Sequence, residues 1–385
     1  IYVFKKPFLF PLLFISGFYI FVLAIENTYE SLFYVFKRLK GRTIKEVFKQ
    51  SLRIFITILI FFLIAKSYYV VGVLVGLILT NIAVLIFVLL YVRRFAFFLF
   101  DKKQKEKLDK KRVIKFLYYL LVGGVAGAIF SYVDILMLGV LLPDTKYIGF
   151  YSAAVTLIWG LAGLLSFNSV FLPIFAQVQK KRLEYALNMV LKYSLMLTIP
   201  IAFGIVSLSK YILLVVYGRE YIEAAVILSL MAFLLIESVN GSFIITLFSA
   251  EEKPKYATKI GVYTLFLNII LNFILISILL NISQLWALIG AATATIISRY
   301  VSLIFLISIM KRKLNVKLTT ANWFKPLIAS VIMFFVLFLL NRYIVKEMTM
   351  LIGIFEIIVG ILIYLFIMLL IDGISKKDLK RLKKT

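Results

Sequence analysis

The chain contains no cysteine and no histidine, and only 18 of its 385 residues are acidic. The first two absences exclude disulfides, thiol nucleophiles, Cys/His metal sites and acid–base catalysis by histidine. The sequence also lacks a Gly-x-x-x-x-Gly-Lys phosphate-binding loop, which nucleotide hydrolysis would require. We therefore expect a protein that is not an enzyme and has no catalytic residues, no cofactor and no metal site.

Long apolar runs dominate what remains. Hydrophobic residues make up 63% of the chain, and its mean hydropathy is +1.05. Soluble domains are about half apolar, so we expect an all-α integral membrane protein. A membrane-crossing helix needs about 20 apolar residues. The runs that meet this requirement lie at 8–25, 50–66, 68–91, 113–141, 148–171, 187–208, 222–248, 258–281, 286–309, 326–342 and 349–371.

The 44 Lys and Arg residues, which give a formal net charge of +26, are distributed by topology. Most of them fall in every second connection, at 26–53, 92–115, 172–192, 249–259, 310–325 and after Asp372. Cytoplasmic loops are rich in Lys and Arg, so this side and the C-terminus are predicted to be cytoplasmic. Eleven spans then place the first residue outside, which suggests that an odd number of helices is missing upstream.

The charged segment 92–112 divides the predicted helices into two groups. We expect a remainder of an N-terminal lobe at 1–91, a basic cytoplasmic linker at 92–112 and a C-terminal lobe at 113–309. Two extra helices at 310–371 and a basic cytoplasmic tail at 372–385 complete the chain. The basic run of the linker, Asp101–Arg112, has no interleaved aromatic residues, so we expect attraction to anionic membrane lipids and no nucleic-acid binding.

Several short motifs in the second group follow one another in a recognisable order. They are SYVDILMLGVLLPDTKYIGFYSAAVTL from Ser131, FLPIFAQ from Phe171, YGREYIEAA from Tyr217, LNIILNFILI from Leu267 and LIGAATAT from Leu288. In order and spacing this series resembles the polysaccharide-exporter branch of the multidrug/oligosaccharidyl-lipid/polysaccharide (MOP) superfamily. Its members are MATE-like two-lobe transporters.

The resemblance implies a fourteen-helix protein of which this chain lacks the first three helices. It also implies a flippase in the cytoplasmic membrane that moves a polyprenyl-linked oligosaccharide for polysaccharide or surface glycan biosynthesis. The expected partners are the polyprenyl-phosphate-linked glycan, membrane lipids and a coupling ion, H+ or Na+. Transport would proceed by alternating access.

Polar residues inside the apolar runs are the candidate site, because such groups are costly in lipid. Asp134 shares one helix face with Gly124, Gly127 and Ser131, a face suited either to a water-filled cavity or to close helix packing. Its carboxylate could respond to a proton or ion, or could bond to a neighbouring helix. Arg299 could clamp a phosphate in bidentate fashion, or pair with a buried carboxylate.

The remaining candidates are amides and one further carboxylate. Glu237 and Asn240 could face a transport cavity, whereas Asn268 and Asn272 share a face and could either join helices or contact substrate. Asn168 and Pro173 mark a possible bend at which one lobe could rock.

Three other functions stay open at this point. A cation-coupled multidrug exporter of the same superfamily would usually have twelve helices, without the two extra C-terminal spans. A membrane glycosyltransferase or polymerase would need a sizeable external loop. A non-transporting scaffold would keep Asp134, Glu237 and Arg299 paired in a dry interior.

Overall fold

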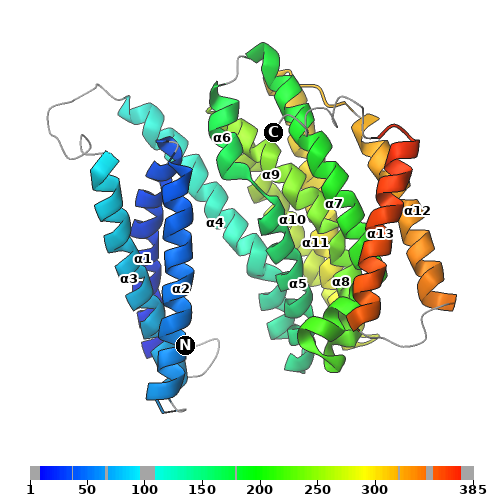
Figure 1. Cartoon of the computed structure of the whole chain (residues 1–385), viewed down its shortest axis with the longest axis horizontal. Helices are drawn as coiled ribbons and strands as arrows, with labels where there is room; N and C mark the ends of the chain where they lie inside the picture. The colour runs from blue at the N-terminus through cyan, green and yellow to red at the C-terminus, as the bar shows by residue number, and fades with distance from the viewer. Residues whose placement is uncertain are drawn as a thin grey trace. The chain divides into compact units, whose positions relative to one another are not determined.

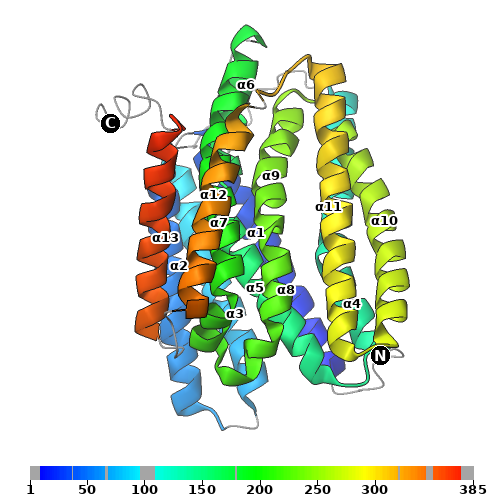
Figure 2. The same cartoon turned by 90° about the vertical axis from the view of Figure 1, so that its right-hand side faces the viewer.

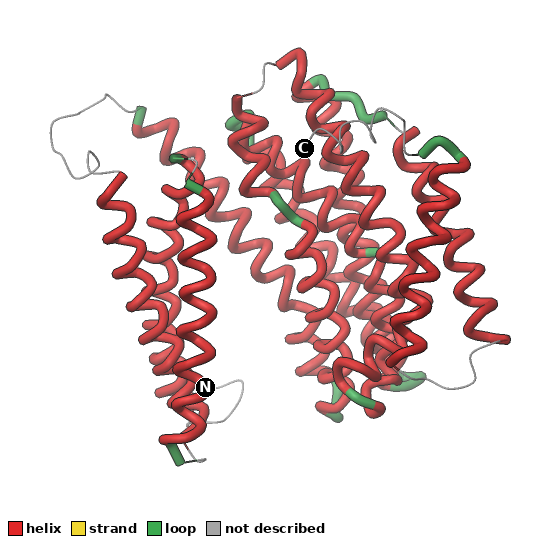
Figure 3. Tube along the Cα trace, in the orientation of Figure 1, coloured by secondary structure: helices red, strands yellow, loops and turns green. Residues whose placement is uncertain are grey.

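The computed structural model describes residues 9–36, 38–65, 68–95, 109–177, 180–319, 321–343 and 350–373. Every regular element in these residues is helical, so the all-α prediction is confirmed (Figure 3). The chain separates into two compact units at 108/109, a position inside the predicted linker. Residues 96–108 of that linker and 374–385 of the predicted tail lie outside the described residues.

Unit 1 contains three helices, α1 (Leu9–Val35), α2 (Leu39–Leu63) and α3 (Tyr69–Phe95). The hairpin between α1 and α2 is held by charges that the sequence analysis had placed in a loop. Lys45 is buried and binds Glu30 at 2.7 Å and Glu26 at 3.3 Å, while Lys49 binds Glu26 at 2.9 Å. Burial raises the free energy of an ion unless it is paired, so these ion pairs fix the two helices against each other.

Unit 2 contains the remaining helices. They are α4 (Lys110–Leu141), α5 (Thr145–Leu165), α6 (Asn168–Gln177), α7 (Lys180–Tyr217), η3 (Arg219–Ala224), α8 (Ala225–Ala232), α9 (Leu234–Ala250), α10 (Pro254–Leu280), α11 (Gln284–Leu314), α12 (Ala321–Tyr343) and α13 (Met350–Leu370). Helices α4, α5 and α11 begin at ordinary N-caps, because Asp109, Asp144 and Ser283 each accept a backbone N–H from the first turn.

Two groups of helices flank the centre of unit 2 (Figures 1 and 2). On one side α10 packs against both α4 and α11, and on the other α12 packs against α7 and α13. Helices α5, α8 and α9 lie between them and carry much of a continuous apolar core that includes Tyr151, Leu235 and Phe248. The polar candidates are therefore held mainly where α4, α9, α10 and α11 meet.

Two predicted spans are interrupted in the structure. The run 222–248 is divided into η3, α8 and α9, with a break at Phe233. The run 148–171 ends as α5 at Leu165, and a separate short helix, α6, begins at Asn168. Apolar composition alone does not reveal such breaks, because apolar residues are compatible with both a continuous and a divided helix.

Nine helical segments of the described residues are long and apolar enough to cross a membrane. The predicted spans 8–25 and 50–66 correspond to parts of α1 and α2, which are not among the nine. Helix α2 carries Glu46, Lys49 and Arg53, so its uninterrupted apolar part runs only from 54 to 63. The other nine predicted runs each overlap one of the nine segments.

Candidate functional site

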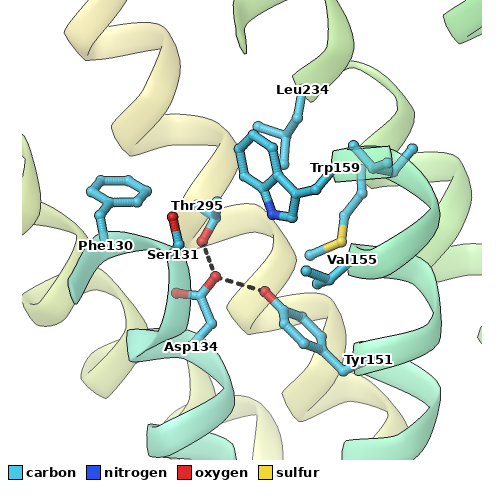
Figure 4. Close-up of a pocket in the computed structure, with 10 residues that line it drawn as sticks. Phe130, Ser131, Asp134, Tyr151, Val155, Trp159, Leu234 and Thr295 are labelled. Atoms are coloured by element: carbon cyan, nitrogen blue, oxygen red, sulfur yellow. Dashed lines mark hydrogen bonds between the residues drawn. The ribbon is translucent and has the colours of Figure 1, made fainter. Parts of the chain in front are cut away.

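Asp134 is the centre of a hydrogen-bonded network that joins four helices, and Figure 4 shows its bonds to Tyr151 and Thr295. Its Oδ2 accepts hydrogen bonds from the Tyr151 hydroxyl at 2.8 Å and the Thr295 hydroxyl at 2.6 Å. Its Oδ1 accepts one from the Asn272 amide at 2.8 Å. These donors come from α5, α11 and α10, and Asp134 itself lies on α4 with only 6% of its surface exposed. Three donors stabilise the ionised form of a buried carboxylate.

The network continues to Asn268, whose amide donates to the Thr295 hydroxyl at 3.1 Å. Both Asn268 and Asn272 are fully buried, and the side-chain oxygen of each has no hydrogen-bond partner in the described residues. A buried acceptor without a partner is costly. The cluster therefore offers oxygen atoms beyond those that its own hydrogen bonds use. A cavity of about 10 Å³, room for about one water molecule, adjoins Asp134 and Ser131.

A larger cavity, of about 320 Å³, lies between α4, α9, α10 and α11. Gly124 and Gly127 line it, and a Cβ atom built at either position would meet nothing within 4 Å. Gly123 also lines this cavity, but it packs closely on α10, since a Cβ atom there would lie 3.1 Å from the Thr258 hydroxyl. Of the two interpretations of the small-residue face, the structure favours a cavity wall at Gly124 and Gly127.

Glu237 and Arg299 line this same cavity from α9 and α11. The guanidinium carbon of Arg299 lies 4.2 Å from the ring centre of Phe130 and 5.1 Å from that of Trp159. No described carboxylate forms an ion pair with Arg299, and its Nε has no hydrogen-bond partner in the described part of the chain. Glu237 is 4% exposed, and its Oε2 is likewise without a partner there. The cavity thus presents one cation and one anion that are not joined to each other.

The other predicted residues are placed elsewhere. The Asn240 amide donates to the carbonyl of Ile236 at 2.7 Å and approaches the Thr198 hydroxyl at 3.4 Å, so it is directed toward α7. Pro173 lies inside the short helix α6, and Asn168 begins that helix, directly after the break that follows α5. The side chain of Asn168 lies outside the described residues. The role of these positions as a bend stays a prediction.

Sequence reasoning did not select Tyr151 and Thr295, which complete the Asp134 network. Both lie within the quoted motifs, Tyr151 in IGFYSAAV and Thr295 in LIGAATAT. A hydroxyl side chain in an apolar helix is common and usually bonds to its own backbone, so neither residue stood out. The repeated small residues around them, which let helices approach closely, were the available signal.

Comparison with known proteins identifies the family to which the chain belongs. A family model described as "Lipid II flippase MurJ" matches residues 7–366. The chain is 27% identical over 291 residues to a probable low-salt glycan biosynthesis flippase, Agl15, of Haloferax volcanii, covering 73% of this chain and 58% of the relative. It is 22% identical over 255 residues to the uncharacterized membrane protein MJ1068 of Methanocaldococcus jannaschii, covering 60% of this chain and 46% of the relative.

A solved structure, described as "Lipid II flippase MurJ, inward closed conformation", has the same fold with a TM-score of 0.63 at 21% identity. The similarity covers 86% of this chain and 67% of that structure. The chain spans about half the length of the curated relatives that it matches. The family model, in contrast, covers most of the present chain. The protein therefore belongs to the lipid II flippase MurJ family.

Proposed function

We propose that the protein moves a polyprenyl-linked oligosaccharide across the cytoplasmic membrane by alternating access, for the synthesis of a polysaccharide or surface glycan. The family membership supports a lipid-linked glycan as the substrate. The end of unit 2 at which α4 and α10 begin is rich in Lys and Arg, and by the charge rule it faces the cytoplasm. The C-terminus then lies on the same side.

The observation that carries this proposal is the position of Arg299. A cation inside an apolar helix is expensive unless it has a partner or a function. Here it lines a cavity without a bound carboxylate, and aromatic rings lie beside the guanidinium. A planar guanidinium can bind a phosphate through two parallel hydrogen bonds, as a lipid diphosphate would require. Arg299 is the proposed contact for that group, with Glu237 as a nearby carboxylate that limits its affinity.

The Asp134 network is the proposed site of the coupling ion. It combines a carboxylate, the Thr295 hydroxyl and two amide oxygens without partners, which is the kind of oxygen-rich set that binds a hard cation. A proton on Asp134 is the alternative. Either would change the charge at the junction of α4, α5, α10 and α11, and could thereby favour one arrangement of these helices over another.

A reconstitution assay tests this function. The purified protein is placed in vesicles that contain a fluorescent polyprenyl-diphosphate oligosaccharide, and a membrane-impermeant glycosidase reports which leaflet holds the glycan. We expect protein-dependent transfer that changes with an imposed Na+ or H+ gradient. Absence of transfer, together with efflux of organic cations from the same vesicles, would contradict the proposal and favour a multidrug exporter. The family membership favours the first outcome.

A further inference from the structure

A third cavity, strongly basic, lies at the end of unit 2 where α4 and α10 begin. It has a volume of about 300 Å³. The cations in its wall come from the first two turns of α4, the first turn of α10 and the residue before α10. We call it the basic pocket, and its lining is Arg112, Lys115, Phe116, Tyr119, Glu252, Lys253, Pro254, Lys255 and Tyr256.

The charges of the basic pocket favour an anion. Four cations line it, against the single carboxylate of Glu252. Neither α4 nor α10 carries an acidic residue in its first turn, and no side chain caps the N-terminus of α10. The N-terminal end of a helix carries a partial positive charge. The Asp109 carboxylate caps this end in α4, whereas the uncapped end of α10 adds to the field of the four side chains. The pocket therefore has the composition of a phosphate-binding site and an excess of positive charge.

The position of the basic pocket indicates that the anion belongs to a lipid. It lies at the ends of two candidate membrane spans, Lys110–Leu141 and Pro254–Leu280, which is the level of the lipid headgroups. Tyr119 and Tyr256 are in its wall, and aromatic residues of this kind are enriched at membrane interfaces. A phosphate ester anchored in the membrane would be presented to the pocket at this depth.

The basic pocket adjoins the cavity that holds Arg299. Tyr119 and Pro254 line both spaces, so a phosphoryl group in the pocket would lie at the mouth of the Arg299 cavity. Thr258 is one turn farther along α10 and lines only the inner cavity. The cations at the helix ends and Arg299 thus form an outer and an inner position along one route.

The carboxylate of Glu252 is already paired with one of the four cations of the basic pocket. Its Oε2 accepts a hydrogen bond from Arg112 Nε at 2.9 Å, and the two side chains form an exposed ion pair. The backbone of Glu252 has a φ of 54°, the left-handed region that non-glycine residues rarely adopt. The turn between α9 and α10 therefore directs a carboxylate at Arg112. An exposed ion pair contributes little stability, so an incoming phosphate can replace it at low cost.

We propose that the basic pocket binds the phosphate or diphosphate group of a membrane lipid, which displaces Glu252 from Arg112 before reaching the Arg299 cavity. The route to Arg299 rests on the proposed flippase function, whereas binding at the basic pocket does not. Two lipids could supply this group, the polyprenyl-diphosphate substrate or an anionic phospholipid. The same experiment distinguishes them.

The experiment measures binding in phosphatidylcholine nanodiscs that contain the full chain. A fluorescent polyprenyl diphosphate is titrated in one arm, and phosphatidylglycerol is titrated as its competitor in the other. The test variant is Lys115→Gln with Lys255→Gln, which removes two pocket cations. The matched control is Lys259→Gln with Lys311→Gln, which removes two exposed cations from the same end of unit 2 but outside the pocket.

We expect the test variant to weaken binding of the diphosphate by roughly tenfold or more, because each basic residue near a membrane surface adds measurably to the attraction of an anionic lipid. The control variant should change the affinity for the diphosphate by less than about twofold. Its two cations are exposed surface charges outside the pocket, and salt screens such charges. Competition only at a large excess of phosphatidylglycerol would assign the pocket to the diphosphate lipid. Competition at equal concentration would assign it to lipid phosphates in general. Equal affinities of the test and control variants would overturn the proposal.

A Glu252→Gln variant supplies an independent readout with the opposite sign. If Glu252 competes with the lipid phosphate for Arg112, its removal should tighten binding by a few-fold. If the ion pair only holds the α9–α10 turn in place, its removal should weaken binding or leave it unchanged, and the displacement step would be wrong. Absence of transport by the wild-type protein in vesicles, with binding at the basic pocket retained, would instead contradict the flippase function and leave the pocket assignment intact.

Discussion

The hydroxyl of Thr295 lies 2.6 Å from Oδ2 of Asp134, and this hydrogen bond joins α11 to α4. Asp134 thereby holds together helices that are far apart in the sequence. In an alternating-access protein such a contact would be remade in each cycle. The first prediction therefore concerns a substitution that removes the charge of Asp134.

Replacing Asp134 by Asn should uncouple transport from the ion gradient. The amide keeps the shape of the carboxylate but removes its charge, and its NH2 group then faces one of the three hydrogen-bond donors. We expect a loss of about 1–3 kcal/mol in the free energy of unfolding. The dependence of the transfer rate on Na+ and H+ should disappear. The measurement is the transfer rate in vesicles over a series of Na+ concentrations and pH values.

Thr295→Val is the matched control for this prediction. It removes one donor to Asp134 but leaves the charge in place. The variant should keep an ion dependence, with a shifted half-saturating concentration. An Asp134→Asn protein that retained the ion dependence of the wild type would exclude Asp134 as the coupling site.

Much of the fold could be predicted from the sequence, because long apolar runs and alternating basic loops are direct consequences of the membrane environment. The polar candidates Asp134, Asn268, Asn272, Glu237 and Arg299 were also predictable, since each stands out in an apolar helix. The cavity between α4 and α10 could not be predicted. Gly123 and Gly124 both border this cavity, but only Gly123 packs closely against Thr258. That difference depends on the angle between α4 and α10, which no periodicity encodes.

The ion cluster of unit 1 was missed for a related reason. Lys45 and Lys49 are spaced like residues of any exposed basic segment, and only the fold of the hairpin places Glu26 and Glu30 against them. In the same way, Asn240 stands out in the sequence, yet its partner is on α7 and not in the cavity. Sequence identifies which groups need partners, and packing decides which partners they receive.

A second prediction concerns the cavity wall. Gly124→Leu should fold, because a Cβ atom there meets nothing within 4 Å, but its side chain should fill part of the cavity and slow transfer at least tenfold. Gly290→Ala provides the contrast. A Cβ atom at Gly290 would lie 2.9 Å from the backbone oxygen of Leu275, so this variant should lose about 1–3 kcal/mol of stability. The midpoint of thermal unfolding and the transfer rate together separate the two effects. Normal transport by a folded Gly124→Leu protein would contradict the cavity assignment.

A third prediction concerns acid stability of unit 1. Burial acts to raise the pKa of Glu30, but hydrogen bonds from Lys45 and Arg42 outweigh it and lower the pKa below its ordinary value of 4.5. The ionised form is therefore favoured in the folded state, and its contribution is present above about pH 4.5 and lost as pH falls through the lowered pKa.

Glu30→Gln should accordingly lower the free energy of unfolding by about 1 kcal/mol at neutral pH, a value reduced by partial exposure to solvent. The difference from the wild type should vanish in strong acid. The measurement is a denaturant titration of both proteins from pH 7 to pH 3. A difference that stays constant over this range would show that the charge of Glu30 is not responsible.

The central claim is that Arg299 contacts the phosphate of a lipid-linked glycan, and substitutions of this one residue test it most directly. The measurement is the transfer rate of polyprenyl-diphosphate oligosaccharide in vesicles for the wild type, Arg299→Lys and Arg299→Gln, with thermal unfolding as the control for folding. We predict a loss of at least tenfold for Arg299→Gln, since a charge-assisted contact is removed. Arg299→Lys should be intermediate, because Lys keeps the charge but not the planar fork. A folded Arg299→Gln protein with the wild-type transfer rate would contradict the account.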